Sequence, residues 1–280
     1  MKNTSNLNVI DVICPVYNHQ KYIRDCLESV FGQEDVFVIA HVIDDASTDD
    51  SLQLIKEFQN KYPHQLRLYS NTRNQGNAVK SLGVNDIKFE GDFWTYIEGD
   101  DFLVNKKKFI KQINLLKMNE YLLATATQCD LWNTELNSHV IIRPDLKRWN
   151  FYDLVTKKHR FKLYCHISSF VWRNEIGRKS ENLFQVCLSD LKKTKSQSEV
   201  LLVHLLLKKS GKHVEFQDIE GSCYRYTRVG IWSSLDSTSQ KLLNDLLQLE
   251  IDSITPNWIK IKQMMVRKVI QNHFLSKRHN

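Results

Sequence analysis

Short apolar runs alternate with amphipathic segments through residues 1–120, and this alternation constrains the fold more than any other feature of the chain. The runs at 9–14, 36–43, 66–69 and 93–97 have the length of buried strands. Between them, apolar residues recur at helical spacing, as in the segment 22–31. Strands that alternate with helices form a parallel sheet with helices on both faces. The sequence therefore predicts an α/β fold with a mostly parallel sheet flanked by helices.

Polar side chains follow three of these predicted strands. Tyr17 comes after the first, Asp44 and Asp45 end the second, and Glu-Gly-Asp-Asp at residues 98–101, the carboxylate motif, follows the fourth. Parallel strands have their carboxyl ends at one edge of the sheet, which is where such sheets bind ligands. We therefore expect the three segments to form one functional site.

The carboxylate motif places three acidic side chains at the end of a buried strand. Such a cluster is costly unless positive charge lies among the carboxylates. A hard divalent cation that holds a diphosphate would supply that charge. The alternative is that Asp100 and Asp101 only cap the helix expected to start near Asn105. The convergence with Tyr17 and Asp45 favours the site.

Composition narrows the class of protein only in part. The 280 residues are 42% hydrophobic and 25% charged, which is ordinary for a globular chain that buries a sizeable core. The formal net charge of +7 suits an anionic partner, which could be a nucleotide sugar, a nucleic acid or an anionic membrane surface.

Cysteine spacing and the apolar runs bear on where the protein acts. The six cysteines are scattered without a C-x-x-C pair, which argues against a zinc site or a disulfide framework and fits a reducing cytoplasm. No secretory signal is visible, and no apolar run approaches the ~18 residues of a membrane span. We expect a cytoplasmic protein, with the inner face of the membrane as an alternative.

The second half of the chain is less regular. We expect strands at 122–131 and 164–172 and another within 222–232, and a helix over 199–209 that Gly211 ends. Beyond Asp252 the chain has no acidic residue, and an apolar stripe runs alongside lysines and arginines. That basic helix either packs its stripe on the domain or lies on an anionic membrane. The stripe consists of Trp258, Ile261, Met265 and Val269.

Four motifs in order resemble those of the family-2 glycosyltransferases, which have the GT-A fold. They cover roughly residues 8 to 120, and the ordered set is highly specific. The motifs are V-I-C-P-V-Y-N at 12–18, V-I-D-D-A-S-T-D-D-S at 42–51, N-Q-G at 74–76 followed by V-K-S-L-G at 79–83, and the carboxylate motif in place of the family's D-x-D.

The resemblance implies a UDP-sugar donor and assigns roles to the first half. Asp45 would accept the N3–H of uracil, while Tyr17 and Pro15 would line and shape the base pocket. Lys80 stands where the family often has an arginine near the nucleotide, and a lysine offers a point charge rather than a fork.

The carboxylate motif would bind the diphosphate end of the donor. Glu98 would face the ribose and metal, Gly99 would lie against the donor, and Asp100 would ligate Mn²⁺ or Mg²⁺. Asp101 would support the loop or cap the following helix.

Family-2 enzymes invert the anomeric centre in one displacement, in which a carboxylate accepts the proton of the attacking hydroxyl. Glu199, at the start of the expected helix, is the candidate base, and a first-turn glutamate that favours the helix dipole is its alternative explanation. Asp190 is the reserve.

A later segment, Y-R-Y-T-R-V-G-I-W-S at 224–233, is similar to a family loop that closes over the donor. The family often has a histidine where Thr227 or Arg228 stands, so Arg228 would supply the cation for the diphosphate. Trp232 would stack on a sugar or belong to the core. His166 falls on the acceptor side.

The resemblance thus implies a hexosyl- or N-acetylhexosaminyltransferase of cell-surface polysaccharide synthesis, acting on a glycan or lipid-linked saccharide. Residues 1–235 would form the GT-A domain, with the nucleotide half at 1–120 and the acceptor half at 121–235, and 236–280 a basic helical extension.

Three other classes compete with this interpretation. A nucleotidyltransferase would have a Gly-rich loop after the first strand, and this chain has none there. The acidic clusters at the strand ends argue against a nucleic-acid-binding protein. A nucleotide-sugar-binding protein without catalysis stays open, because Glu98, Lys80 and the missing histidine depart from the family pattern.

Overall fold

The computed structural model describes residues 7–156, 163, 165–175, 182–227 and 235–257. The strands are β1 (Asn8–Val16), β2 (Val36–Asp44), β3 (Leu66–Ser70), β4 (Phe93–Tyr96), β5 (Phe102–Leu103), β6 (Leu122–Asn133), β7 (Ser138–Ile142), β8 (Arg148–Asn150), β9 (Val171–Arg173) and β10 (His213–Tyr226). The helices are α1 (Ile23–Phe31), α2 (Ser51–Lys61), α3 (Ala78–Gly83), α4 (Lys108–Met118), α5 (Phe151–Thr156), α6 (Leu183–Leu191), α7 (Glu199–Ser210) and α8 (Ser237–Ile254).

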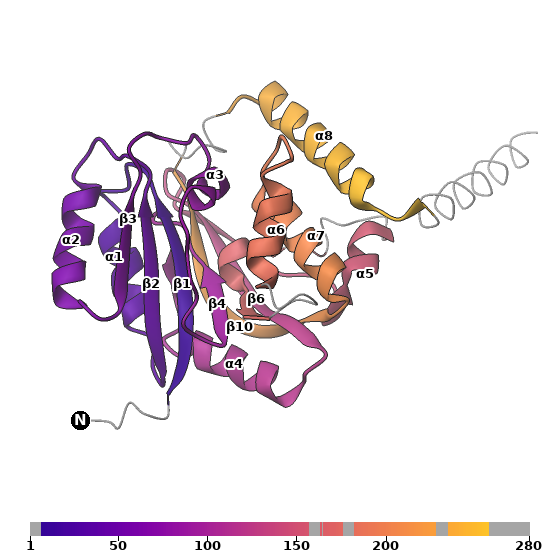
Figure 1. Cartoon of the computed structure of the whole chain (residues 1–280), viewed down its shortest axis with the longest axis horizontal. Coiled ribbons are helices and arrows are strands. Elements are labelled where there is room, and N and C mark those ends of the chain that lie inside the picture. The colour runs from indigo at the N-terminus through magenta and orange to yellow at the C-terminus, as the bar shows by residue number, and fades with distance from the viewer. Residues whose placement is uncertain (1–6, 157–162, 164, 176–181, 228–234, 258–280) are drawn as a thin grey trace, which may run out of the picture.

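The described strands form one mixed sheet in the order β3-β2-β1-β4-β9-β6-β10-β5, with β7 beside β6 and β8 beside β10. The strands β1, β2, β3 and β4 pair in parallel, as do β6 and β10, whereas β9 runs antiparallel to both of its neighbours. Helices cover both faces, with α1 and α2 on one side and α6 and α7 on the other (Figure 1). The expected α/β class is confirmed.

Two hydrophobic clusters lie on opposite faces of the sheet because side chains alternate along β1. Val12 packs with Leu27 of α1 and Ile55 of α2 on one face. Ile13 packs on the other face with side chains of α6 and α7. The large aromatic rings gather in this second cluster, where Trp94 and Trp172 stack with centroids 5.5 Å apart.

The order of elements in the first half follows the sequence prediction closely, but two strands of the second half differ from it. Within 164–172, the described residues form a 3-10 turn at Ile167–Ser169 before the short β9. The Ser169 hydroxyl donates to the His166 carbonyl at 2.7 Å, a local bond that competes with strand pairing.

β10 begins at His213, well before the expected strand within 222–232. Its first residues alternate buried Val214 with charged or polar side chains, so no apolar run marks the strand start.

The chain beyond the sheet is helical as far as it is described. α8 follows its cap residue Asp236 and buries Ile251. The apolar stripe predicted at 258–269 lies outside the described residues. In the part of the chain that the structure describes, no helix is both long and apolar enough to span a membrane.

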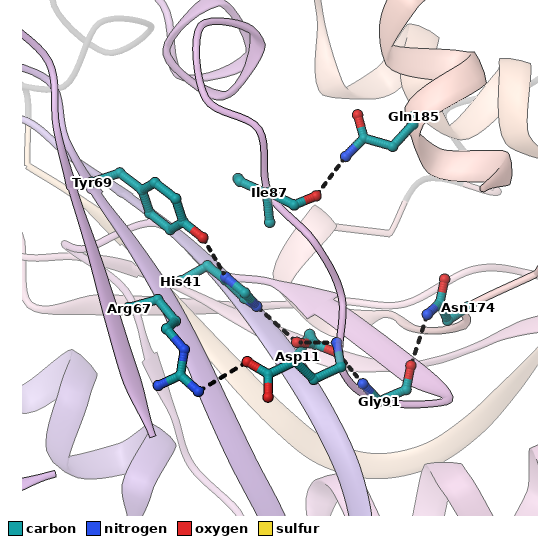
Figure 2. Close-up of polar contacts among 9 residues, drawn as sticks. Asp11, His41, Arg67, Tyr69, Ile87, Gly91, Asn174 and Gln185 are labelled. Atoms are coloured by element: carbon teal, nitrogen blue, oxygen red, sulfur yellow. Dashed lines mark hydrogen bonds and ion pairs between the residues drawn. The ribbon is translucent and has the colours of Figure 1, made fainter. Parts of the chain in front are cut away.

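A buried polar network fixes the segment that leads from α3 into β4. Asp11, fully buried in β1, accepts hydrogen bonds from the Gly91 N–H at 2.7 Å and the Glu90 N–H at 3.1 Å (Figure 2). His41 Nε2 lies 2.7 Å from the same carboxylate, and its Nδ1 lies 3.2 Å from the Tyr69 hydroxyl. The network therefore sets where β4, and the carboxylate motif after it, can lie.

Further contacts hold the same segment from both sides. Arg67 pairs with Glu90 at 2.9 Å, and the Gln185 side chain of α6 donates to the Ile87 carbonyl at 2.7 Å. Asn174, which follows β9, donates to the Gly91 carbonyl at 2.8 Å (Figure 2).

Replacing Asp11 should destabilise the whole fold. Asp11→Ala leaves the Glu90, Gly91 and His41 donors buried without their acceptor, at a cost of about 3 kcal/mol. Urea unfolding measures the change in the free energy of unfolding. The matched control is Asp86→Ala, because Asp86 is exposed and lies 3.6 Å from an exposed lysine; its cost should stay below about 0.5 kcal/mol. Equal effects of the two variants would contradict the structural role of Asp11.

Candidate active site

Asp45 lies where β1 and β2 end side by side. Its N–H donates to the Val16 carbonyl at 2.8 Å, and its side chain is almost fully buried. One carboxylate oxygen accepts from the Asn71 amide at 2.7 Å and the other from the Gln75 N–H at 2.9 Å. A carboxylate has about four acceptor positions, so Asp45 is held in place and can still accept from a ligand.

Side-chain hydrogen bonds tie the loop after β1 to the loop after β2. Asn18 has a φ of 56° and accepts from the Thr48 N–H at 2.8 Å, while its own N–H donates to the Ser47 hydroxyl. Gln20 N–H donates to Asp49 at 3.0 Å. These contacts fix the loop that holds Tyr17, whose ring is 38% exposed.

The carboxylate motif packs directly against the end of β1. The Gly99 N–H donates to the Pro15 carbonyl at 3.0 Å. A Cβ on Gly99 would lie 2.9 Å from both His19 Nδ1 and Val16 Cγ2, so only glycine fits without displacement. The expected segments at 15–17, 45 and 98–101 thus meet at one edge of the sheet.

Acidic side chains crowd this edge. Burial, then the charges of Asp100 and Glu199, raises the pKa of Glu98 well above its usual range. Burial, then the charges of Asp100 and Glu98, does the same to the pKa of Asp101. One oxygen of Asp100 and one of Asp101 are buried without a hydrogen-bond partner among the described residues. Such orphaned oxygens are suited to a bound cation.

Those oxygens fit a hard divalent cation that takes oxygen ligands. Asp100 is the better placed of the two ligands. One of its oxygens has no hydrogen-bond partner among the described residues, and the other makes only a long contact of 3.8 Å with His19 Nε2. Among the described residues, no group of three or more His, Cys, Asp or Glu side chains forms a complete metal site. A cation held here would therefore complete its coordination with diphosphate oxygens and water, as Mg²⁺ commonly does.

Arg225 of β10 is a site residue that the sequence prediction did not weigh. Its buried guanidinium donates to the Asp100 carbonyl and to the Asp25 carboxylate, both at 2.8 Å, and its N–H donates to Asp101 at 3.1 Å. The guanidinium carbon lies 4.5 Å from the Phe102 ring centre and 5.3 Å from that of Tyr22. Arg225 therefore fixes the backbone of the motif and brings positive charge to it.

Glu199 begins α7 beside this cluster. Ser198 caps the helix by accepting from the Val200 N–H at 3.1 Å. Burial raises the pKa of Glu199, and its charge in turn raises the pKa of Glu98 and Tyr96. Its carboxylate is therefore close enough to interact with the motif, although α7 is remote in sequence.

Asp190, the reserve base, has different surroundings. It pairs with Lys209 at 2.7 Å and Lys193 at 2.9 Å, and these contacts lower its pKa. A carboxylate stabilised in its charged form by two lysines is a weak proton acceptor. Of the two carboxylates, Glu199 is the one whose surroundings raise its pKa.

The remaining predicted residues are Lys80, Arg228 and Trp232. Lys80 is exposed on α3, the helix whose Ser81 hydroxyl accepts from Asn71, the partner of Asp45. Lys80 is adjacent in sequence to Ser81, which shares the Asn71 amide with Asp45. Arg228 and Trp232 lie outside the described residues.

Comparison with known proteins gives bacterial glycosyltransferases among the relatives. An uncharacterised glycosyltransferase of Haemophilus influenzae is 31% identical over 134 residues, which are 47% of this chain and 52% of the relative. Staphylococcus aureus TarS, a poly(ribitol-phosphate) β-N-acetylglucosaminyltransferase, is 34% identical over 99 residues, 34% of this chain and 17% of that protein. In both comparisons the match spans no more than about half of the relative's length.

Solved structures show the same fold at low sequence identity. TarS residues 1–349 in complex with UDP-GlcNAc superpose with a TM-score of 0.60 at 18% identity, over 86% of this chain and 64% of that one. The mannosyltransferase PcManGT of Pyrobaculum calidifontis, in complex with GDP-Man and Mn²⁺, gives a TM-score of 0.54 at 14% identity, over 83% and 61%.

A family model described as "Glycosyl transferase family 2" matches residues 11–179, which include Asp45 and the whole carboxylate motif. Because this match covers more than half of the 280 residues, the chain belongs to glycosyl transferase family 2.

Proposed function

We propose that this protein is an inverting, metal-dependent glycosyltransferase that moves a hexose or N-acetylhexosamine from a UDP-sugar to an acceptor hydroxyl. One observation carries the proposal: Asp45, the carboxylate motif and Glu199, from three separate segments, gather at one edge of the sheet. A nucleotide site, a cation site and a general base are the parts that such a reaction requires.

Asp45 is the proposed uracil-binding residue. Its carboxylate is fixed by Asn71 and Gln75 and has acceptor capacity left for the N3–H of uracil. Tyr17 and Pro15 line the base pocket, and Lys80, or Arg228 beyond the described residues, neutralises phosphate charge. The structures of TarS with UDP and with UDP-GlcNAc support this choice of donor.

Asp100 is the proposed ligand of Mn²⁺ or Mg²⁺, with Glu98 beside it and Gly99 allowing close approach. When bound, the cation neutralises charge on the departing diphosphate. Arg225 holds the backbone of Asp100 in place, and Glu199 accepts the proton of the attacking hydroxyl. A half-buried glutamate with a raised pKa is suited to this task, because the raised pKa makes it a stronger proton acceptor than an ordinary glutamate.

The acceptor that we propose is a glycan or lipid-linked saccharide in cell-surface polysaccharide synthesis. Relatives named for poly(ribitol-phosphate) glycosylation and for minor teichoic acid biosynthesis support this class. In the proposed division, residues 1–120 bind the nucleotide, 121–235 bind the acceptor and 236–280 form an extension. The proposed place of action is the cytoplasm, with peripheral contact to an anionic membrane through that extension.

A nucleotide-sugar-binding protein without catalysis is the second candidate. Thr227, which is buried, or Arg228 stands where the family often has a histidine, and the missing histidine favours this alternative. The two candidates differ in the effect of removing the base, because a binding protein has no turnover to lose.

Removing the charge of Asp100 should abolish the metal dependence of nucleotide binding. Asp100→Asn keeps the shape of the side chain, so UDP affinity should fall at least about tenfold in Mn²⁺ and match the affinity in EDTA. Calorimetric titration of UDP measures both. Asp92→Asn is the control, because this exposed aspartate lies at the other end of β4 and its replacement should leave both affinities unchanged. Full Mn²⁺ dependence in Asp100→Asn would exclude Asp100 as the ligand.

Glu199→Gln should separate binding from catalysis. Loss of a general base lowers kcat by roughly 10²–10⁴-fold, while UDP affinity should stay within about twofold because Asp45 and Asp100 are intact. Asp190→Asn is the matched control and should retain turnover. Steady-state kinetics with a panel of UDP-sugars measures the effect. A Glu199→Gln variant with normal kcat, or an inactive Asp190→Asn variant, would reassign the base.

The pH dependence of kcat follows from the raised pKa of Glu199. The base works only when deprotonated, so activity falls as the pH falls through its raised pKa. We expect the acidic limb of the kcat profile to lie above the usual glutamate pKa. A limb at or below that ordinary value would contradict the assignment.

A further inference from the structure

Tyr224 lies on the opposite face of β10 from Arg225, and the proposed roles above do not use it. Side chains alternate along a strand, and Arg225 reaches Asp25 of α1. Tyr224 therefore points to the face covered by α6 and α7, where Glu199 begins its helix. Tyr224 is half-buried, so part of the residue is accessible to a ligand.

A fixed support lies behind the Tyr224 ring. His166 stacks on it with centroids 4.5 Å apart and an angle of 19° between the planes. His166 Nδ1 lies 2.7 Å from the Ser168 hydroxyl, which bonds to the Ser222 hydroxyl at 2.9 Å. His166 Nδ1 also lies 3.8 Å from one carboxylate oxygen of Asp101, so the stack is beside the carboxylate motif. The stack can therefore hold the tyrosine ring next to the motif.

The acidic groups of the site act electrostatically on the Tyr224 hydroxyl. After burial, the charges of the three carboxylates in the motif and of Glu199 raise its pKa to above the usual tyrosine range. The phenol therefore keeps its proton and can donate it in a hydrogen bond. Tyr96 interacts with several of the same charges, but its side chain is fully buried and cannot meet a substrate.

We propose that Tyr224 binds the transferred sugar, with its ring forming the wall between the carboxylate motif and Glu199 and its hydroxyl donating to a sugar hydroxyl. This inference rests on the proposed function. In a transferase with Asp100 at the diphosphate and Glu199 at the acceptor hydroxyl, the sugar must lie between these two groups. An aromatic ring with a polar tip at this position can pack on sugar C–H groups and select hydroxyl geometry.

The test compares Tyr224→Phe and Tyr224→Leu with a matched control, Tyr62→Phe. Tyr62 is also half-buried and stacked, with its ring 4.0 Å from that of Phe31, but it lies after α2 and outside the site. The readouts are UDP affinity in Mn²⁺, kcat/KM for the UDP-sugar that the unaltered protein turns over fastest, and the thermal midpoint. Tyr224→Phe keeps the stack on His166, so it reports the hydroxyl in a folded protein.

We expect all variants to bind UDP within about twofold of the unaltered protein, because UDP lacks the sugar. Tyr224→Phe should lower kcat/KM about fivefold, the worth of one hydrogen bond, and Tyr224→Leu at least about tenfold, with Tyr62→Phe unchanged. Normal kcat/KM in Tyr224→Leu would overturn the proposal, as would a parallel loss of UDP affinity. Failure of the unaltered protein to bind UDP would instead overturn the proposed donor, and the inference with it.

Discussion

Repulsion among buried carboxylates is the constraint on which the rest of this structure depends. Glu98, Asp100 and Asp101 follow one short strand, and Glu199 adds a fourth acidic group from α7. Carboxylates that interact in a partly buried site raise one another's pKa unless cations lie among them. Arg225 offsets part of this repulsion within the described chain, and a divalent cation with its diphosphate would offset the rest.

The surrounding fold keeps these four acidic groups together despite their repulsion. Asp11 and His41 hold the segment before β4. At the opposite edge, hydrogen bonds from the Thr48 N–H to Asn18 and from the Gln20 N–H to Asp49 fix the loops after β1 and β2. Gly99 lets the motif approach β1 as closely as it does. Because these hydrogen bonds and the close packing at Gly99 lie within the protein itself, the site is arranged before any ligand binds, which is what electrostatic catalysis requires.

The spacing of apolar residues predicted most of the strands and helices in residues 1–120, because buried parallel strands and amphipathic helices have clear periodicities in sequence. The edge location of Asp45 and Asp100 followed from strand direction alone. The role of Arg225 could not be predicted, since it depends on contact with Asp25, 200 positions away in sequence. β10 was also missed in part, because polar residues interrupt its first half. The position of Glu199 beside Glu98 likewise depends on how α7 packs, which no local pattern records.

The central claim is that one edge of the sheet binds a nucleoside diphosphate through Asp45 and a divalent cation through Asp100. A crystal structure with UDP and Mn²⁺, with the metal located by anomalous scattering, tests it most directly. The account predicts a manganese peak within bonding distance of Asp100 and of the diphosphate, with uracil N3 facing Asp45. UDP bound elsewhere, or a manganese peak away from residues 98–101, would contradict it.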